Sequence, residues 1–321
     1  MRLAVRPETF PLAGVFTISR GSRTEAHVLT VTLDEGGAQG RGECVPYARY
    51  GESLDSVAAE IAGLPERLTR AGLQPLLPAG AARNAVDCAL WDLEAKRTGT
   101  RVWQLAGLPA PGPEITAFTL SLAAPAAMRA AAARNAHRPL LKIKLGGEGD
   151  MARLEAVRAG APRARIVVDA NEGWTPDAYA ALAPALVRLG VAMVEQPLPA
   201  GDDAALGLMP RPLPVCADES CHDRASLPAL AGRYDMVNIK LDKTGGLTEA
   251  LALRDEHRRR HREAGADHAA DHDTEPGGVG SVAQGAEVVD LDGPLLLARD
   301  RDVALRYDHR GVHPPAPELW G

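Results

Sequence analysis

Apolar runs of strand length recur along the second two-thirds of the chain, and most of them end in a charged residue. Their centres follow one another at intervals of 22 to 26 residues. A repeat of about 25 to 30 residues fits one β-strand and one helix of a (β/α)8 barrel. The centres lie near Phe118, Ile143, Val168, Val194, Ala217, Ile239 and Val289, and the seventh of the eight in chain order falls at an unclear point near Ala264.

Helical spacing of apolar residues fills several of the intervals between these runs. Glycine often follows the last apolar residue, as is common at helix ends. The pattern therefore predicts helices that cover a parallel sheet, whose strands are apolar on both faces. The predicted helices span residues 150–160, 176–190, 224–232 and 247–262.

The first hundred residues follow a different pattern. Residues 26–44 form two short segments around a glycine-containing turn, the first of them alternating in polarity, which predicts an antiparallel hairpin. Ser53 is a predicted helix N-cap, and residues 81–97 place apolar side chains largely on one helix face before Gly99. Strands followed by helices predict an α+β capping domain.

A proline-rich stretch separates the two patterns. Residues 109–113 contain three prolines, which cannot continue a helix or a strand, so this stretch is the predicted linker. We expect the capping domain at residues 1–110, completed by the C-terminal tail 300–321, and the barrel domain at residues 111–299.

Length and charge narrow the class of protein. A chain of 321 residues suits one barrel and one smaller domain. Lys and Arg number 36 against 42 Asp and Glu, a net charge of −6, so we expect neither a nucleic-acid nor an anionic-membrane partner. Four cysteines without metal-site spacing predict reduced thiols and a cytoplasmic location. No apolar run approaches the length of a membrane span, and homo-oligomer formation stays open.

Charged residues in or at the ends of the predicted strands are the candidate chemistry. Lys142 and Lys144 share one face of their strand, because side chains alternate along a strand. Later runs end in or near Asp169, Glu195, Asp218 and Lys240. Such residues converge at the C-terminal mouth of a barrel. Three carboxylates there repel one another unless a cation lies between them, and hard oxygen ligands suit Mg²⁺.

This arrangement predicts a proton-transfer reaction. A cation held by carboxylates can bind a substrate carboxylate and stabilise the enolate that forms when a proton leaves the adjacent carbon. Lysines that face each other across that carbon could remove the proton from one face and return it on the other.

Five motifs occur in order along the chain. They are Lys142-x-Lys144, Asp169-Ala-Asn171, Val194-Glu195-Gln196-Pro197, Ala217-Asp218-Glu219-Ser220, and Asn238-Ile-Lys240 followed by Gly245-Gly246-Leu247. This series resembles the enolase superfamily, in its muconate-lactonizing subgroup, over nearly the whole chain. A lysine or histidine base that works with Mg²⁺ is a known property of that superfamily.

The resemblance implies a role for each matching residue. It implies Mg²⁺ ligands at Asp169, Glu195 and Asp218. It implies an opposed acid and base at Lys144 and Lys240, with Lys142 as a supporting cation. The residues expected to surround these groups are Asn171, Glu219 and Asn238.

Two further segments resemble the dipeptide epimerases of this superfamily. Asp290 and Asp292 match a DxD pair that holds the ammonium group of the substrate. Arg20, in the TISR stretch of a capping loop, matches the arginine that meets the side-chain carboxylate of a glutamate-ending dipeptide. The resemblance therefore implies a small-molecule substrate, Ala-Glu, a dipeptide released from bacterial cell-wall peptide.

Other activities stay open at the level of sequence. N-acylamino acid racemases, o-succinylbenzoate synthases and cycloisomerases belong to the same subgroup, but their substrates offer no ammonium group to Asp290 and Asp292. A catalytically impaired member is a further alternative, because residues 258–276 are dense in charge where the family has a buried strand. One hypothesis is a shifted reading frame between about 262 and 283. Resequencing of the gene rejects it if the same bases are read and close relatives show the same peptide.

Overall fold

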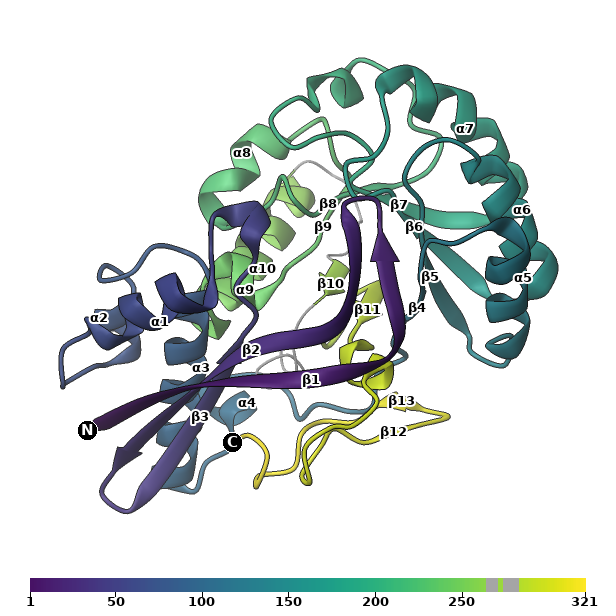
Figure 1. The fold of residues 1–321 in the computed structure, drawn as a ribbon. Coiled ribbons are helices and arrows are strands. Elements are labelled where there is room, and N and C mark those ends of the chain that lie inside the picture. Colours follow the sequence, from purple (N-terminus) through teal and green to yellow (C-terminus); the bar gives the residue numbers. More distant parts are fainter. Residues whose placement is uncertain (264–270, 274–282) are drawn as a thin grey trace.

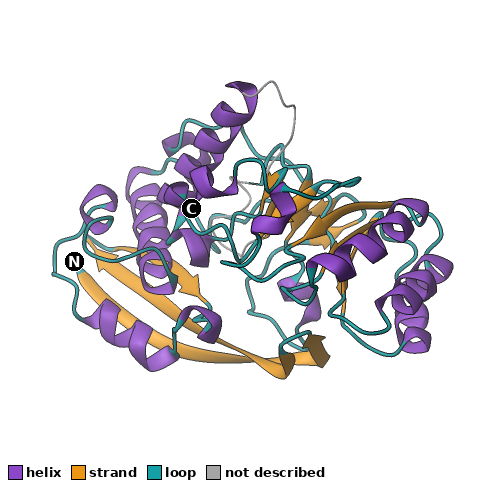
Figure 2. Cartoon of the chain, turned by 90° about the horizontal axis from the view of Figure 1, so that it is seen from above, coloured by secondary structure: helices purple, strands orange, loops and turns teal. Residues whose placement is uncertain are grey.

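The computed structural model describes residues 1–263, 271–273 and 283–321 (Figure 1). An antiparallel sheet with helices forms the N-terminal part, and a parallel sheet covered by helices forms the part that follows (Figure 2). Within the described ranges, no helix combines the length and the apolar character that a membrane crossing requires.

The N-terminal part contains the predicted hairpin and one strand more. Its strands are β1 (Arg2–Ile18), β2 (Gly21–Glu35) and β3 (Ala38–Cys44), in that order. The helical segments that follow are η1 (Ala48–Tyr50), α1 (Leu54–Ala62), α2 (Arg70–Leu73), α3 (Ala81–Thr98) and α4 (Val102–Leu105). Ser53 caps α1, and Gly99 ends α3 in the left-handed region, as predicted. The apolar pattern does not predict β1, because none of its residues is fully buried.

Helix α3 packs directly on β3 because glycine leaves room between them. A Cβ atom on Gly42 would lie 2.0 Å from the Ala85 carbonyl oxygen, and a Cβ atom on Gly40 would lie 2.2 Å from the Ala89 carbonyl oxygen. Helix α3 therefore packs close enough to the sheet for both to share the core of the N-terminal part. The core includes Leu29, Val31, Leu33, Val57, Ile61, Val86 and Leu93.

The parallel strands follow one another around the barrel in chain order. One sheet contains β4 (Phe118–Leu120), β5 (Leu140–Lys144), β6 (Arg165–Asp169), β7 (Val191–Glu195), β8 (Val215–Ala217) and β9 (Met236–Val237). β10 (Asp271–Asp273) and β11 (Val288–Asp290) form a parallel pair. Thr116, just before β4, forms a parallel bridge with Val289, so the last strand adjoins the first. The expected (β/α)8-type barrel with an N-terminal α+β domain is confirmed.

Helices follow most of these strands. The longer ones are α5 (Pro125–Arg134), α6 (Asp150–Gly160), α7 (Pro176–Arg188) and α10 (Leu247–Glu263). The short segments are η2 (Ala204–Gly207), η3 (Arg224–Ser226), α8 (Leu227–Leu230), α9 (Leu241–Thr244) and η4 (Gly293–Leu296). The predicted helix 224–232 is therefore a short pair, η3 and α8.

The seventh strand lies further along the chain than its predicted centre near Ala264. The structure places it at β10, and Ala264 itself lies outside the described residues. The prediction fails because Asp271–Asp273 contains no apolar residue, so no apolar run marks this strand. The predicted sixth centre, Ile239, falls just beyond β9.

Side chains alternate between the barrel interior and the surrounding helices. On β5, Leu141 and Ile143 pack in the large core shared with the helices, whereas Leu140 belongs to a separate interior cluster. Lys142 and Lys144 lie on the same face as Leu140 and therefore point inward. The interior cluster, here called the apolar floor, consists of Ala117, Leu140, Val167, Met193, Cys216, Met236 and Val288.

The C-terminal tail, with β12 (Tyr307–Asp308) and β13 (Gly311–Val312), returns to the N-terminal part. The Gly321 carbonyl oxygen accepts a hydrogen bond from the Val102 N–H at 2.9 Å. The Trp320 indole N–H donates to the Cys88 carbonyl oxygen at 3.2 Å. These contacts accord with a capping domain completed by the tail, while the domain boundaries stay a prediction.

Replacing Gly42 by alanine tests the close packing of β3 on α3. The added methyl group has no room beside the Ala85 carbonyl oxygen, so we expect the free energy of unfolding to fall by about 1–3 kcal/mol. Urea denaturation measures this change. Gly14→Ala is the matched control, because a Cβ atom there meets nothing within 4 Å. Equal destabilisation by both substitutions would contradict the packing argument.

Candidate active site

The candidate site lies directly above the apolar floor, at the C-terminal mouth of the barrel. Seven strand segments each supply one residue to the floor. Two positions after that residue, each segment carries a buried polar residue. These polar side chains point into the barrel because strand side chains alternate. They are Thr119, Lys142, Asp169, Glu195, Asp218, Asn238 and Asp290.

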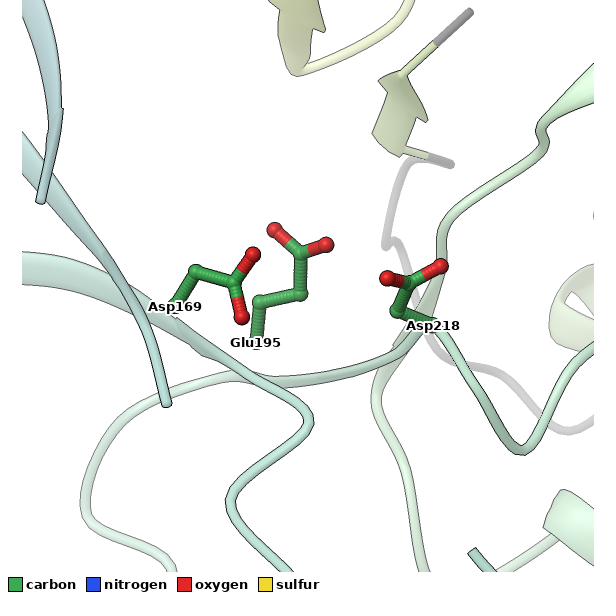
Figure 3. Close-up of side chains that lie close together, drawn as sticks. All are labelled: Asp169, Glu195 and Asp218. Atoms are coloured by element: carbon green, nitrogen blue, oxygen red, sulfur yellow. The ribbon is translucent and has the colours of Figure 1, made fainter. Parts of the chain in front are cut away.

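Three of these residues form a compact acidic cluster (Figure 3). Asp169, Glu195 and Asp218 each place one carboxylate oxygen within 4.8 Å of the others, and all three are buried. Burial and the Asp169 charge raise the pKa of Glu195 to about 8. Burial also acts to raise the pKa of Asp169, but Lys144 and Lys142 outweigh it and hold that pKa at about 2. Three carboxylates offer hard oxygen donors, which are the ligands that Mg²⁺ prefers.

Lys142 lies at the centre of the acidic groups. Its ammonium nitrogen lies 2.6 Å from Glu195 Oε2, 2.8 Å from Asp290 Oδ2 and 3.3 Å from Asp169 Oδ2. The side chain is only 1% exposed, so its charge is compensated by these carboxylates rather than by water. Lys142 is therefore a fixed cation within the barrel.

Two other predicted lysines lie on opposite sides of the acidic cluster. Lys144 Nζ donates to Asp169 Oδ2 at 2.6 Å, and Lys240 Nζ donates to Asp218 Oδ2 at 2.8 Å. Lys144 ends β5, whereas Lys240 follows β9, and three strands separate them around the barrel. The structure thus brings together the predicted acids and amines, with the acids in the middle.

Predicted neighbours hold the acidic cluster in place. The Asn171 backbone N–H donates to Asp169 Oδ1 at 2.9 Å, and Asn238 Nδ2 donates to Glu195 Oε1 at 2.8 Å. Gln196, to which the sequence assigned no role, accepts a hydrogen bond from the Asp218 backbone N–H at 2.9 Å. Asn171 and Gln196 adopt positive φ angles of 44° and 33°, so the backbone is strained where it carries these contacts.

Lys243 is a site residue that the sequence did not reveal. Its ammonium nitrogen donates to the Asp218 carbonyl oxygen at 2.6 Å, to Asp218 Oδ1 at 2.7 Å and to the Asn238 carbonyl oxygen at 2.9 Å. It is buried, yet it lies on the four-residue helix α9, which is too short to show which face is buried. Its only signal is its place between Lys240 and the Gly245-Gly246 pair.

The two predicted ammonium-binding acids lie at the end of β11 and just after it. Both are buried, and the structure places them at the edge of the site next to β4 and β5. Asp290 pairs with Lys142, whereas Asp292 Oδ2 accepts a hydrogen bond from the Thr119 backbone N–H at 2.5 Å. Each aspartate therefore has a protein partner in this structure.

Arg20 reaches the barrel from the turn between β1 and β2. Its guanidinium donates to the Asn171 carbonyl oxygen at 3.1 Å and to the Tyr47 hydroxyl at 3.0 Å. It also lies 2.8 Å from Glu219 Oε1 and 3.2 Å from Glu172 Oε2. Burial, aided by the Asp218 charge, raises the pKa of Glu219 to about 7. Arg20 thus connects the N-terminal part to the mouth of the barrel.

Comparison with known proteins decides the family. The N-terminal domain of mandelate racemase and muconate lactonizing enzyme matches residues 1–107, and a family described as enolase C-terminal domain-like matches residues 125–266. The chain belongs to the enolase superfamily. The superfamily expected from the five motifs is thereby confirmed.

Relatives within the superfamily include enzymes that act on dipeptides and on acyl amino acids. L-Ala-D/L-Glu epimerase of Escherichia coli (strain K12) is 48% identical over 312 residues, which cover 95% of this chain and 97% of the relative. N-acetyl-D-glutamate racemase of Pseudoalteromonas sp. is 39% identical over 300 residues, with 92% and 95% covered.

A solved structure matches the whole chain. An enolase family member from Agrobacterium tumefaciens with homology to dipeptide epimerases, crystallised with sodium and L-Ala-L-Glu, is 51% identical. Its TM-score is 0.94, and 99% of each chain is covered. A dipeptide epimerase from Enterococcus faecalis V583, complexed with Mg and L-Leu-L-Tyr, has a TM-score of 0.85 at 27% identity, with 99% of this chain and 98% of that chain covered.

Cation binding to the acidic cluster should depend on pH. The pKa of Glu195, raised to about 8 in the cation-free protein, means that a proton competes with the cation below that pH. We expect the affinity for Mg²⁺ to rise about tenfold per pH unit up to about pH 8 and then to level off. Isothermal titration of chelator-treated protein measures it. The affinity of Glu155→Gln, at an exposed position, should follow the wild-type curve. A pH-independent affinity would contradict the shift.

Proposed function

We propose that the chain is a Mg²⁺-dependent epimerase of Ala-Glu dipeptides that acts by a two-base 1,1-proton transfer. The observation that carries this proposal is the position of Lys144 and Lys240 on opposite sides of the acidic cluster. The relative from Escherichia coli and the Agrobacterium structure with L-Ala-L-Glu support the same substrate class.

The residues present fit a divalent cation. Asp169, Glu195 and Asp218 are the proposed ligands, because their oxygens are close together and buried. When bound, Mg²⁺ supplies positive charge that holds the substrate carboxylate and stabilises its enolate form. Asn171 and Asn238 keep two of the ligands in place through the hydrogen bonds described above, and Glu219 adjoins the third.

The lysines carry the proton transfer. The neutral amine of one lysine, Lys144 or Lys240, removes the proton from the α-carbon of the second residue, so that a C–H bond breaks and an N–H bond forms. The ammonium group of the other lysine then gives a proton to the opposite face of the same carbon. The configuration inverts, and the total number of protons is unchanged. Lys142 remains charged beside the reacting carboxylate.

Charged groups at both ends of the substrate would set its orientation. Asp290 and Asp292 are the proposed partners of the substrate ammonium group, and Arg20 is the proposed partner of its side-chain carboxylate. The proposed binding partner is thus a small-molecule substrate, a dipeptide. The four cysteines are buried and are not joined in disulfides, which supports the proposed cytoplasmic location.

A second candidate is racemisation of an N-acylated glutamate. The 39% identical N-acetyl-D-glutamate racemase supports it, since such a substrate has no ammonium group. The geometry allows this reading because Lys142 and the Thr119 N–H already engage Asp290 and Asp292.

Proton exchange in D₂O distinguishes the two candidates. The Mg²⁺-loaded protein is incubated with L-Ala-L-Glu and, separately, with N-acetyl-L-glutamate, and NMR follows loss of the α-proton signal. We expect exchange with formation of L-Ala-D-Glu, and a kcat/KM at least about tenfold lower for the acylated substrate, because that substrate lacks the ammonium group that would bind to the two aspartates. Exchange of N-acetylglutamate alone would favour the second candidate. A folded protein inert to both would contradict the proposal.

A further inference from the structure

A second arginine from the N-terminal part lies beside Arg20 at the rim of the barrel. Arg49, in η1, binds Glu172 through two parallel contacts, Nε to Oε2 at 2.9 Å and Nη2 to Oε1 at 2.8 Å. A guanidinium that engages both carboxylate oxygens holds the pair in one geometry. Arg49 and Glu172 therefore form a fixed ion pair between the N-terminal part and the barrel.

The backbone also fixes Glu172. Its φ angle is 64°, in the left-handed region that disfavours residues other than glycine. The Glu172 N–H donates to the Gln196 carbonyl oxygen at 2.9 Å, and the Ala200 N–H donates to Glu172 Oε1 at 2.8 Å. A strained residue held by several contacts points to a positional constraint at this site.

Glu172 is shared between the two arginines, but not equally. Arg49 contacts both carboxylate oxygens, whereas Arg20 reaches only Oε2, at the longer distance of 3.2 Å. The charge of Glu172 is thus compensated mainly by Arg49. Without Arg49, the charge of Glu172 would be compensated mainly by Arg20, and Glu172 would compete with a substrate carboxylate for that guanidinium.

We propose that Arg49 and Glu172 are positioning residues that select substrates with an acidic second side chain. Arg49 compensates the charge of Glu172, so that Glu172 adds little to the contact that Glu219 already makes with Arg20, and Arg20 remains able to receive the carboxylate of the substrate. This inference rests on the proposed function and extends it to residues that do not touch the substrate. The preference for an acidic side chain would then depend on the Arg49–Glu172 ion pair as well as on Arg20.

Arg49→Met and Arg49→Lys test the inference through the split between KM and kcat. Epimerisation of L-Ala-L-Glu is followed with wild type and both variants, and L-Ala-L-Gln serves as the neutral substrate of the same shape. For Arg49→Met we expect KM for L-Ala-L-Glu to rise about tenfold, with kcat within about twofold, because only ground-state binding of the acid is lost. Arg49→Lys keeps the charge without the double contact and should give an intermediate KM.

The controls separate a positioning role from a structural one. Arg188→Met removes an arginine from an exposed pair with Glu155 and should leave both constants unchanged. Equal losses of kcat/KM with the Glu and Gln dipeptides, or an unchanged KM for L-Ala-L-Glu in both Arg49 variants, would overturn the inference. If wild type itself fails to epimerise L-Ala-L-Glu, the proposed function fails. If wild type is active and the variants keep its preference, only this inference fails.

Discussion

Charge compensation among buried groups is the constraint on which the rest of the molecule depends. An isolated carboxylate or ammonium inside a protein is costly, so buried charges occur with partners. In this barrel Lys142 and Lys243 are both buried and each contacts several oxygens. The carboxylates can be buried because these ammonium groups compensate their charge, and the ammonium groups can be buried because the carboxylates compensate theirs. Many charged groups can occupy one small space because each is compensated by the others. Loss of one of them would leave its partners buried without compensation.

The alternation of strand side chains places this charged layer above an apolar one. On β6, for example, Val167 belongs to the apolar floor and Asp169, two positions later, belongs to the acidic cluster. The same step relates Met193 to Glu195 on β7. The apolar floor lies beneath this charged layer inside the barrel. The chemistry is therefore determined by which residue ends each strand, while the remainder of the strand serves the core.

This regularity explains why much of the molecule could be predicted from its sequence. The spacing of apolar runs predicts the barrel, and strand periodicity places Lys142 and Lys144 on one inward face. Their partners Asp169, Glu195 and Asp218 follow from the same periodicity because parallel strands end at the same edge.

The features that were missed lack such a local signal. β10 contains no apolar residue, so a hydrophobic pattern cannot detect it. Lys243 is buried by tertiary packing, and a helix of four residues carries no readable periodicity. Arg49 and Glu172 are 123 residues apart and meet only because the N-terminal part rests on the mouth of the barrel.

The contact between the N-terminal part and the barrel links recognition to chemistry. Arg20 touches the Asn171 carbonyl oxygen, and the Asn171 N–H binds Asp169 in the acidic cluster. On its other side Arg20 contacts Glu219, the residue after Asp218. The proposed side-chain recognition and the proposed cation site therefore share neighbours. We expect a substitution at Arg20 to alter cation binding, even though Arg20 and the acidic cluster lie on different parts of the chain.

The central claim is that Lys144 and Lys240 act on opposite faces of one carbon. Its most direct test is α-proton exchange in D₂O, followed separately from L-Ala-L-Glu and from L-Ala-D-Glu, with Lys144→Ala and Lys240→Ala. We expect that neither variant epimerises, that each still exchanges the α-proton of one diastereomer, and that the diastereomer exchanged by one variant is the opposite of that exchanged by the other. Exchange of the same diastereomer by both variants, or of both diastereomers by either one, would contradict it.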